Sequence, residues 1–401
     1  MNALPENSRA VKSLLISSIY YPPDVGGISK FMSSMMSALG PDRVCCLTGV
    51  RAESAREREE STGRVYRRPL AFAKPKYLQA IGWASAVAEI MMRERPRAVQ
   101  LATLYDGYLG LWLQKWLHLP YVIYAHGNEV LDAMQGSWDG HRRTIQSADC
   151  VFANSYYTAD LLKKAGVQPE RIQVVHPGCD VDKFRPIEVS IEDRRSILGP
   201  HAEKKVILTV GRLVIRKGHD LVIRALPQVL KAHPDTCYLV VGSGPAKSTI
   251  ASLANEMGLG DKVIFWENAK DSELLKIYNL CDVFAMPSRA NLKSCDVEGF
   301  GIVFIEANAC GKPVIAGRSG GMADAVVDGE TGFLVDPDDS DALAESLSRM
   351  IGDASFARRI GQQGRDRAMR EFAWKLIAAR VDETMQRLVF EKETTKGGGA
   401  S

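Results

Sequence analysis

Short apolar segments alternate with longer amphipathic segments along the whole chain, and this alternation restricts the fold more than any other feature. Helical periodicity occupies the intervals, as at 28–39, 219–230 and 340–351. Alternating strands and helices form parallel sheets that helices cover on both faces. We therefore expect an α/β protein with two doubly wound parallel sheets. The predicted strands are 14–19, 44–47, 98–101, 121–125, 150–153 and 172–175 in the first half, and 206–210, 238–241, 263–265, 283–286, 314–316 and 333–335 in the second.

The length of 401 residues suits two domains, each large enough for its own core. Turn residues at 177–180 and a charged segment without strand pattern at 187–203 mark the boundary between them. Ligands of doubly wound sheets bind beyond the carboxyl ends of the strands, so two such domains predict a site in a cleft between them. The predicted parts are an N-terminal domain (1–185), a C-terminal domain (186–372), a C-terminal helix (373–392) and a disordered tail (393–401).

Composition excludes several classes of protein. The chain has 51 basic and 48 acidic residues and a net charge of +3, which argues against nucleic acid as a partner. No run of 18 apolar residues is present, so no membrane-spanning helix is expected. The eight cysteines show no C-x-x-C spacing and several fall in apolar runs. We therefore expect Cys150, Cys237 and Cys281 to be buried thiols and the setting to be reduced and cytoplasmic.

Two glutamates eight positions apart, Glu298 and Glu306, flank a glycine-containing loop and a predicted helix start. Gly299 and Gly301 would let the backbone approach a ligand, and free N–H groups at the helix start would attract phosphate. Glu306 lies among apolar residues, where an unpaired carboxylate is costly, so it needs a partner from the protein or a ligand. The pattern suits a sugar nucleotide, but it is equally compatible with a loop acid and a surface helix acid.

Basic residues follow the predicted strand 206–210. Arg212 and Lys217 could together neutralise a departing diphosphate, since guanidinium and ammonium groups both bind phosphate oxygens. Solvated basic residues in a loop are the alternative, and we expect Arg216, between them, to be solvated.

Two loops in the first half also follow predicted strands. Gly26 and Gly27 precede a helical segment and could bring backbone N–H groups to a phosphate or a sugar, although a plain glycine turn is the alternative. The dinucleotide motif G-x-G-x-x-G is absent there. His126 ends the strand 121–125 and could hydrogen-bond a sugar or an acceptor hydroxyl, or be satisfied by the turn backbone.

Asp336 and Asp338 form a D-x-D pattern that could hold a divalent cation. They lie in a Pro-containing turn before a helix, which favours turn and capping roles over metal binding. We therefore predict no metal site.

The segment 64–83 contains five basic residues, no acidic ones and four aromatic side chains. Basic and aromatic residues together can lie on an anionic membrane surface. We consider this segment a candidate contact with the inner face of a membrane, with a solvated loop and helix start as the alternative. The aromatic residues are Tyr66, Phe72, Tyr77 and Trp83.

Taken in order, these loops resemble those of the retaining glycosyltransferases of family 4. The likeness covers nearly the whole chain and is strongest in TVGRLVIRKGHDLVIRALPQV, VGSGP and DVEGFGIVFIEANACGKPVIAGRSGG. The segments HGNEV and MPSR are particularly similar to the phosphatidylinositol mannosyltransferases and related lipid or polysaccharide glycosyltransferases. The resemblance implies a GT-B architecture, with two Rossmann-like domains facing across a cleft, the first binding acceptor and the second binding donor.

The resemblance also implies roles for individual residues. Arg212 and Lys217 match the basic pair on the donor diphosphate, and Glu298 matches the glutamate that contacts the transferred sugar. Glu306 matches the ribose-binding glutamate, and His126 matches the histidine beside the transferred sugar. The segment 373–392 matches a helix that returns to the first domain. The other donor-binding positions are Gly26, Gly27, Phe300, Gly301 and Ile302.

The implied reaction is retaining transfer of a hexose, favouring mannose, from a nucleotide sugar such as GDP-mannose. The acceptor would be a lipid-linked, saccharide or small-molecule hydroxyl, and no metal or other cofactor is implied. Because no protein nucleophile is needed, Glu298 is expected to orient the sugar. A sugar-nucleotide epimerase of the same fold and a non-catalytic sugar-nucleotide-binding protein remain alternatives, whereas the missing G-x-G-x-x-G disfavours a NAD-dependent dehydrogenase.

Overall fold

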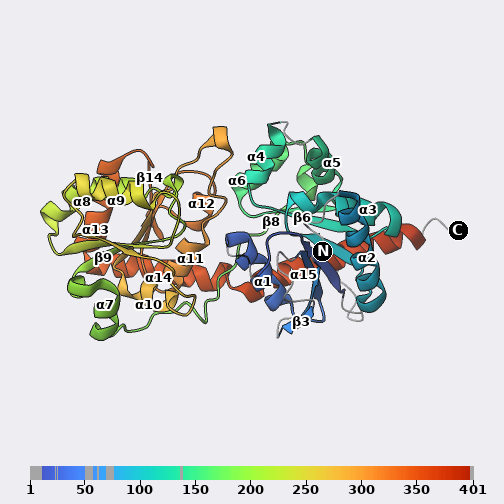
Figure 1. Ribbon diagram of the computed structural model, residues 1–401, viewed down its shortest axis with the longest axis horizontal. Helices are drawn as coiled ribbons and strands as arrows, with labels where there is room; N and C mark the ends of the chain where they lie inside the picture. Colours follow the sequence, from blue (N-terminus) through green and yellow to red (C-terminus); the bar gives the residue numbers. More distant parts are fainter. Residues whose placement is uncertain are drawn as a thin grey trace. The chain divides into compact units, whose positions relative to one another are not determined.

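The protein is described by a computed structural model that covers residues 11–22, 24, 26–49, 57–60, 63–68, 76–135 and 139–397. The chain forms two compact units (Figure 1). The first unit combines Met1–Gly178 with Trp374–Ser401, and the second comprises Cys179–Ala373. Each unit contains one sheet, as the alternation of apolar segments predicts.

Within the described residues, the sheet of the first unit has eight strands in the order β3-β4-β2-β1-β5-β6-β7-β8. Neighbouring strands run parallel, except that β3 is antiparallel to β4. The strand order reverses between β1 and β5, which is where such sheets bind ligands. The strands are β1 (Ser13–Ser17), β2 (Val44–Gly49), β3 (Glu57–Glu60), β4 (Gly63–Arg68), β5 (Ala98–Leu101), β6 (Tyr121–Ala125), β7 (Cys150–Ala153) and β8 (Ile172–Val174).

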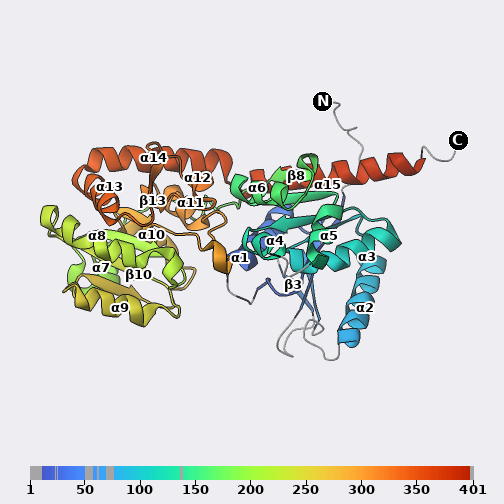
Figure 2. The ribbon, with the colours of Figure 1, turned by 90° about the horizontal axis from the view of Figure 1, so that it is seen from above.

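Helices cover both faces of this sheet. On one face, α1 (Gly27–Leu39) packs against α15 (Trp374–Gly397), the red helix of Figure 1 and Figure 2. Leu15, Phe31 and Ile377 belong to the shared core there. On the other face, Gly110 lets α3 approach closely, because a Cβ would lie 2.6 Å from the side chains of both Leu101 and Tyr121. The helices besides α1 and α15 are α2 (Lys76–Glu94), α3 (Gly107–Leu117), α4 (Asn128–Met134), α5 (Asp139–Ser147) and α6 (Tyr156–Lys164).

The sheet of the second unit has six parallel strands in the order β11-β10-β9-β12-β13-β14. This is the doubly wound order of dinucleotide-binding folds, and it reverses between β9 and β12. The strands are β9 (Lys205–Val210), β10 (Thr236–Val241), β11 (Val263–Trp266), β12 (Val283–Met286), β13 (Val314–Gly317) and β14 (Gly332–Val335).

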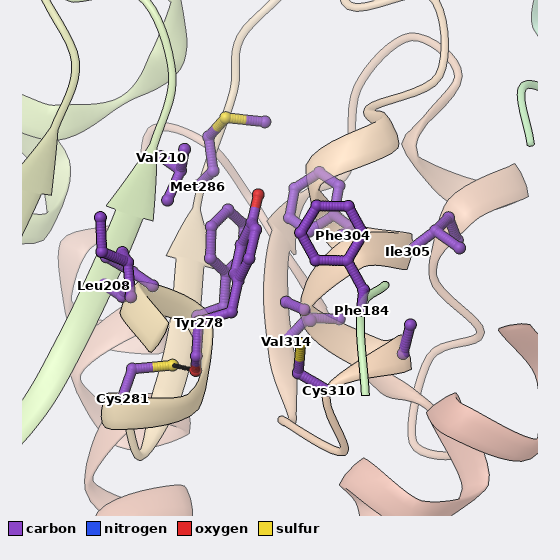
Figure 3. Packing of buried hydrophobic residues seen from close by; sticks show 14 of the residues in the cluster. Phe184, Leu208, Val210, Tyr278, Cys281, Met286, Phe304, Ile305, Cys310 and Val314 are labelled. Carbon is purple, nitrogen blue, oxygen red and sulfur yellow. Dashed lines mark hydrogen bonds between the residues drawn. The ribbon is translucent and has the colours of Figure 1, made fainter. Parts of the chain in front are cut away.

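Successive residues of β9 contribute to two cores, one on each face of this sheet. Leu208 packs on the side of α10 and α11 with Tyr278 and Phe304 (Figure 3). Ile207 packs on the side of α8, α9 and α13. The helices are α7 (Ile191–Leu198), α8 (His219–Ala232), α9 (Lys247–Glu256), α10 (Leu274–Leu280), α11 (Ile302–Ala309), α12 (Met322–Ala325), α13 (Ser340–Gly352) and α14 (Ala354–Glu371).

The predicted strands are all present, but β3 and β4 were not predicted. The alternative of a solvated loop at the start of 64–83 is wrong, because Gly63–Arg68 forms β4. Its charged residues conceal a strand because they pair with acids of α2: Arg64 and the Tyr66 hydroxyl contact Glu94 at 3.1 and 2.6 Å, and Arg68 contacts Glu89 at 2.7 Å.

The unit boundary lies earlier than the predicted 185/186. Cys179 and Phe184 belong to the core of the second unit, and the Cys179 N–H donates to the Phe372 carbonyl at 2.7 Å. The C-terminal helix also extends beyond its predicted end, through Gly397, so 393–397 is helical. The remainder of the predicted tail lies outside the described residues.

Candidate functional site

The predicted helix start beside Glu298 is present, and Gly301 shapes it. Gly301 precedes α11 with φ +89°, and a Cβ there would lie 2.7 Å from the Phe304 ring. Only glycine adopts this conformation without strain. No side chain caps α11, and no acidic residue lies in its first turn. Its first N–H groups are therefore available to an anion.

The loop after β13 fixes the backbone of Glu298. The Gly321 N–H donates to the Glu298 carbonyl at 2.9 Å. Gly320 has φ +57°, and a Cβ there would lie 2.5 Å from the same carbonyl oxygen. A larger residue at 320 would displace Glu298, so this close approach requires glycine.

The carboxylate of Glu298 forms a mostly buried ion-pair cluster. It contacts the Lys217 ammonium and lies 2.6 Å from Nη1 of Arg216, whose Nε lies 2.7 Å from an oxygen of Asp296. Burial would raise the pKa of Glu298, but the charges of Lys217 and Arg216 outweigh burial and lower it to about 2. Glu298 is therefore ionised at neutral pH.

The expectation that Arg216 is solvated is wrong. Its side chain is only 16% exposed, because Asp296 and Glu298 each bind one side of its guanidinium. Two carboxylates separated by one residue were the available signal for this pairing. Arg212, by contrast, is exposed, and its side chain forms no hydrogen bond or ion pair with the described parts of the chain. The predicted basic pair is thus divided: Lys217 joins Glu298, and Arg212 remains open to an anion.

The fold brings this cluster together at the reversal of strand order. Lys217 follows β9 and Glu298 follows β12, and these neighbouring strands lie on the two sides of the reversal. Their carboxyl-terminal loops therefore meet at one edge of the sheet, where doubly wound domains bind nucleotides.

Glu306 has the protein partner that its burial requires. The Tyr278 hydroxyl donates to Glu306 Oε2 at 2.7 Å, and Glu306 is 3% exposed. Burial, together with the Glu306 charge, raises the pKa of Tyr278 well above its usual value. The Phe300 ring is buried against Phe372, with 5.6 Å between centroids, so only the Phe300 backbone could contact a ligand. Ile302 is the first residue of α11.

Gly26 and Gly27 lie at the start of α1, which has neither a side-chain cap nor an acidic residue in its first turn. A Cβ on either glycine would meet no atom within 4 Å. Packing therefore does not require glycine at these two positions.

His126 is held by the neighbouring strand end. Its Nε2 donates to the Ala102 carbonyl at 2.9 Å, and its backbone N–H donates to Glu129 at 2.6 Å. Because a carbonyl oxygen only accepts, this bond leaves Nδ1 as the acceptor of a neutral ring. The predicted site residues thus form two groups, one in each unit.

Two predictions outside the site are confirmed. Asp336 accepts a hydrogen bond from the Asp338 N–H at 3.0 Å, as expected of a turn acid. All eight cysteines are free and buried. In the part of the chain that the structure describes, no helix combines the length and apolarity that a membrane crossing requires.

Several side chains of the predicted membrane contact at 64–83 are buried. Tyr66 and Trp83 are 1% and 6% exposed, and Arg67 is buried too, with Nη1 donating to the Pro22 carbonyl at 2.5 Å. These residues pack within the first unit and cannot lie on a membrane surface. Phe72 lies outside the described residues, as does the side chain of Tyr77.

Comparison with known proteins agrees with this architecture. The family model "Glycosyltransferase Family 4" matches residues 25–183, and "Glycosyl transferases group 1" matches residues 190–367. Sucrose-phosphate synthase of Thermosynechococcus elongatus has the same fold, with a TM-score of 0.78, 25% identity and coverage of 94% of this chain and 99% of that chain.

Two curated relatives are similar over most of their length. The GDP-mannose-dependent alpha-(1-6)-phosphatidylinositol monomannoside mannosyltransferase of Mycolicibacterium smegmatis is 31% identical over 91% of this chain and 96% of its own. The GDP-mannose-dependent monoacylated alpha-(1-6)-phosphatidylinositol monomannoside mannosyltransferase of Corynebacterium glutamicum is 31% identical over 94% of this chain and 98% of its own.

Two doubly wound units, the second with an uncapped helix start beside basic side chains, define a nucleotide-sugar-dependent glycosyltransferase of the GT-B type. Two family models match the chain one after the other, and the curated relatives match over nearly their whole length. These matches identify the glycosyltransferase family. The chain belongs to glycosyltransferase family 4.

Proposed function

We propose that this glycosyltransferase transfers mannose from GDP-mannose to a hydroxyl group of a lipid acceptor, with retention of configuration. The names of both curated relatives support the donor and the phosphatidylinositol type of acceptor. The observation that carries the proposal is the meeting of Lys217 and Glu298 beside the uncapped N-terminus of α11. A positive group, a carboxylate and free N–H groups together suit a diphosphate that carries a hydroxyl-rich sugar.

The donor diphosphate would be held by Lys217, Arg212 and the first N–H groups of α11. Arg212 is open to solvent and has no carboxylate partner in the described chain, so it can bind phosphate without breaking an ion pair. These groups would stabilise the negative charge that develops on the departing diphosphate, which is the main electrostatic task of the reaction.

In the proposed reaction, the bond between the sugar C1 and the β-phosphate oxygen breaks with oxocarbenium character. The acceptor oxygen forms the new bond to C1 on the same face, and its proton passes to the departing phosphate oxygen. Glu298 would accept hydrogen bonds from sugar hydroxyls while Lys217 and Arg216 keep it ionised. It orients the sugar and forms no covalent bond to it.

The remaining residues would position the two substrates. Glu306 would contact the ribose diol. Gly26 and Gly27, at the uncapped N-terminus of α1, would offer backbone N–H groups to the diphosphate. His126 would accept a hydrogen bond from the transferred sugar through Nδ1, since Nε2 is occupied by Ala102.

Thermal unfolding against a donor panel, followed by product analysis, tests the proposal. A ligand that binds the folded state raises the unfolding midpoint by mass action. We expect GDP-mannose to raise it more than UDP-glucose, UDP-GlcNAc or NAD. Incubation with GDP-mannose and phosphatidylinositol monomannoside should then add an α-mannosyl group to the lipid and release GDP. A shift with NAD alone, release of an epimerised sugar nucleotide, or donor binding without transfer would each contradict the proposal.

A further inference from the structure

A pocket of about 620 Å³ opens in the first unit at the reversal of its strand order. Ser18, which directly follows β1, lines one side of it, and Tyr105 and Asp106, in the segment after β5, line another. Helices α2 and α3 complete the lining. The pocket therefore lies where the topology of a doubly wound sheet predicts a ligand.

The lining is aromatic and apolar except at one end. Trp83 and Val87 of α2 face the pocket together with Tyr108 and Trp112 of α3. The polar end contains Asp106, whose carboxylate accepts from the Ser18 N–H at 3.3 Å and from the Thr103 hydroxyl at 3.4 Å. An apolar pocket with a small convergent polar end is the usual form of a small-molecule site.

Exposed aromatic residues continue from this pocket along α3. Tyr108, Trp112 and Trp116 follow one another at intervals of four residues, so they share one face of the helix. They are 55%, 42% and 64% exposed, and the ammonium of Lys115 lies 5.5 Å from the Trp116 ring. The stripe spans about 12 Å, at 1.5 Å per residue. On α2, Ile81 adds a further exposed side chain, at 63%, on the rim of the pocket.

The shape of this apolar surface distinguishes between possible ligands. A saccharide acceptor would need hydrogen-bonding partners along its length, but away from Ser18 and Asp106 the lining offers only the hydroxyl and indole N–H groups of its aromatic side chains. A compact aromatic group would fill the pocket but leave the stripe beyond it uncovered. A flexible alkyl chain can follow both, and tryptophan and tyrosine rings suit the border between an apolar chain and water.

We propose that the pocket and the α3 stripe bind the alkyl chain of an amphiphilic acceptor, with its hydroxyl-bearing head at Ser18 and Asp106. This inference rests on the proposed function, because it names where the lipid acceptor of that reaction binds. It assigns acceptor specificity to Trp112 and its neighbours on α2 and α3. The hydroxyl group to be glycosylated would then lie at the carboxyl ends of β1 and β5 in the first unit.

Binding of monomeric alkyl maltosides to the full chain tests the proposal without requiring turnover. Calorimetric titration would compare octyl maltoside, decyl maltoside and free maltose, each below its micelle-forming concentration. Burial of one methylene group is worth about 0.8 kcal/mol, so each additional methylene should tighten binding roughly fourfold. We expect decyl maltoside to bind about tenfold or more tightly than octyl maltoside, and maltose not to bind.

Two variants and one matched control locate the site. Trp112→Ala removes an aromatic wall of the pocket, and Ala84→Phe fills the pocket from α2. Phe390→Ala removes a similarly exposed aromatic side chain from α15, 49% exposed against 42% for Trp112. Both pocket variants should weaken decyl maltoside at least tenfold, whereas Phe390→Ala should bind like the unmodified chain.

The GDP-mannose-induced shift in unfolding midpoint, measured on the same variants, separates this inference from the proposed function. Trp112→Ala should retain that shift, because the donor-site residues Lys217 and Glu298 belong to the other unit. Binding that depends on alkyl-chain length, without any GDP-mannose-induced shift in the unfolding midpoint, would support the pocket and contradict the proposed function. Equal binding of decyl maltoside by Trp112→Ala and the unmodified chain would overturn the inference. Binding that is independent of chain length, or that prefers phenyl glucoside to the alkyl series, would also overturn it.

Discussion

Glu298 and Lys217 form an ion pair across the reversal of strand order in the second unit, since Lys217 follows β9 and Glu298 follows β12. The pair joins segments that are far apart in the sequence at the edge where a doubly wound sheet binds its ligand. The same two charges therefore stabilise this edge of the sheet and lie where we propose that the donor binds.

Glu298 should contribute to the acid sensitivity of the fold. Its pKa is about 2 in the folded chain against an ordinary 4.5, so its stabilisation is present above pH 4.5 and is lost as the pH falls toward 2. The shift corresponds to on the order of 3 kcal/mol at most. Glu298→Gln should be less stable at pH 7 and should lose less stability between pH 5 and pH 3.

Urea unfolding at both pH values checks this expectation. Glu267→Gln, which removes one member of the exposed pair with Lys247, is the control and should behave like the unmodified chain. An equal loss of stability in Glu298→Gln and the unmodified chain would contradict the ion-pair account.

Asp106 should have the opposite pH dependence. Burial, only partly offset by hydrogen bonds from Ser18 and Thr103, raises its pKa to about 6 from an ordinary 3.8. Stability associated with its neutral form is present below pH 3.8 and is lost as the pH rises through 6. Asp106→Asn cannot ionise, so it should avoid this loss, which amounts to up to about 3 kcal/mol. Relative to the unmodified chain, it should therefore be more stable at pH 8 than at low pH. Denaturant unfolding at pH 5 and pH 8 measures the free energy of unfolding of both proteins. If the difference between Asp106→Asn and the unmodified chain is the same at both pH values, the raised pKa is contradicted.

Arg212 and Arg216 should separate function from stability. Arg212→Ala should change the free energy of unfolding by no more than about 0.5 kcal/mol, because the side chain is exposed and forms no hydrogen bond or ion pair with a described residue. Its turnover should fall at least tenfold. Arg216→Ala should cost roughly 1–3 kcal/mol, because it removes ion pairs with two carboxylates and a hydrogen bond to Glu298. Chemical denaturation and initial rates with GDP-mannose test both, and near-normal turnover of Arg212→Ala would exclude its diphosphate role.

Gly27 and Gly301 form a second matched pair. Gly27→Ala should fold normally, since open space surrounds the added Cβ, yet it should reduce the donor-induced shift in unfolding midpoint. Gly301→Ala should cost more than about 1–2 kcal/mol, because φ is +89° and the Cβ would press on the buried Phe304 ring. Unfolding midpoints with and without GDP-mannose distinguish them. If Gly27→Ala shows the same GDP-mannose-induced shift in unfolding midpoint as the unmodified chain, Gly27 does not contact the donor.

The strands that could be predicted are those whose surroundings are apolar. β6 and β7 have the predicted bounds because their side chains are buried on both faces of the sheet. β4 could not be predicted, because Arg64 and Arg68 are neutralised by acids of α2 that the local sequence does not identify. Charged residues within a strand conceal it when their partners come from another element.

The same limit applies to the candidate site. The need of Glu306 for a partner followed from its apolar neighbours alone, but its partner Tyr278 comes from another helix. The pairing of Arg216 with Glu298 joins residues 82 positions apart, so the local pattern favoured solvation. The functional roles of these residues stay predictions until the variants are measured.

The first unit is discontinuous, because α15 follows the second unit in the sequence. During synthesis, the apolar side chains that α15 covers, Phe31 among them, therefore stay uncovered until Trp374 and the residues after it have been made. The second unit is continuous and is complete before α15 emerges. On the ribosome, the first unit should consequently finish folding after the second, although Met1–Gly178 is made earlier, and it should depend on chaperones for longer.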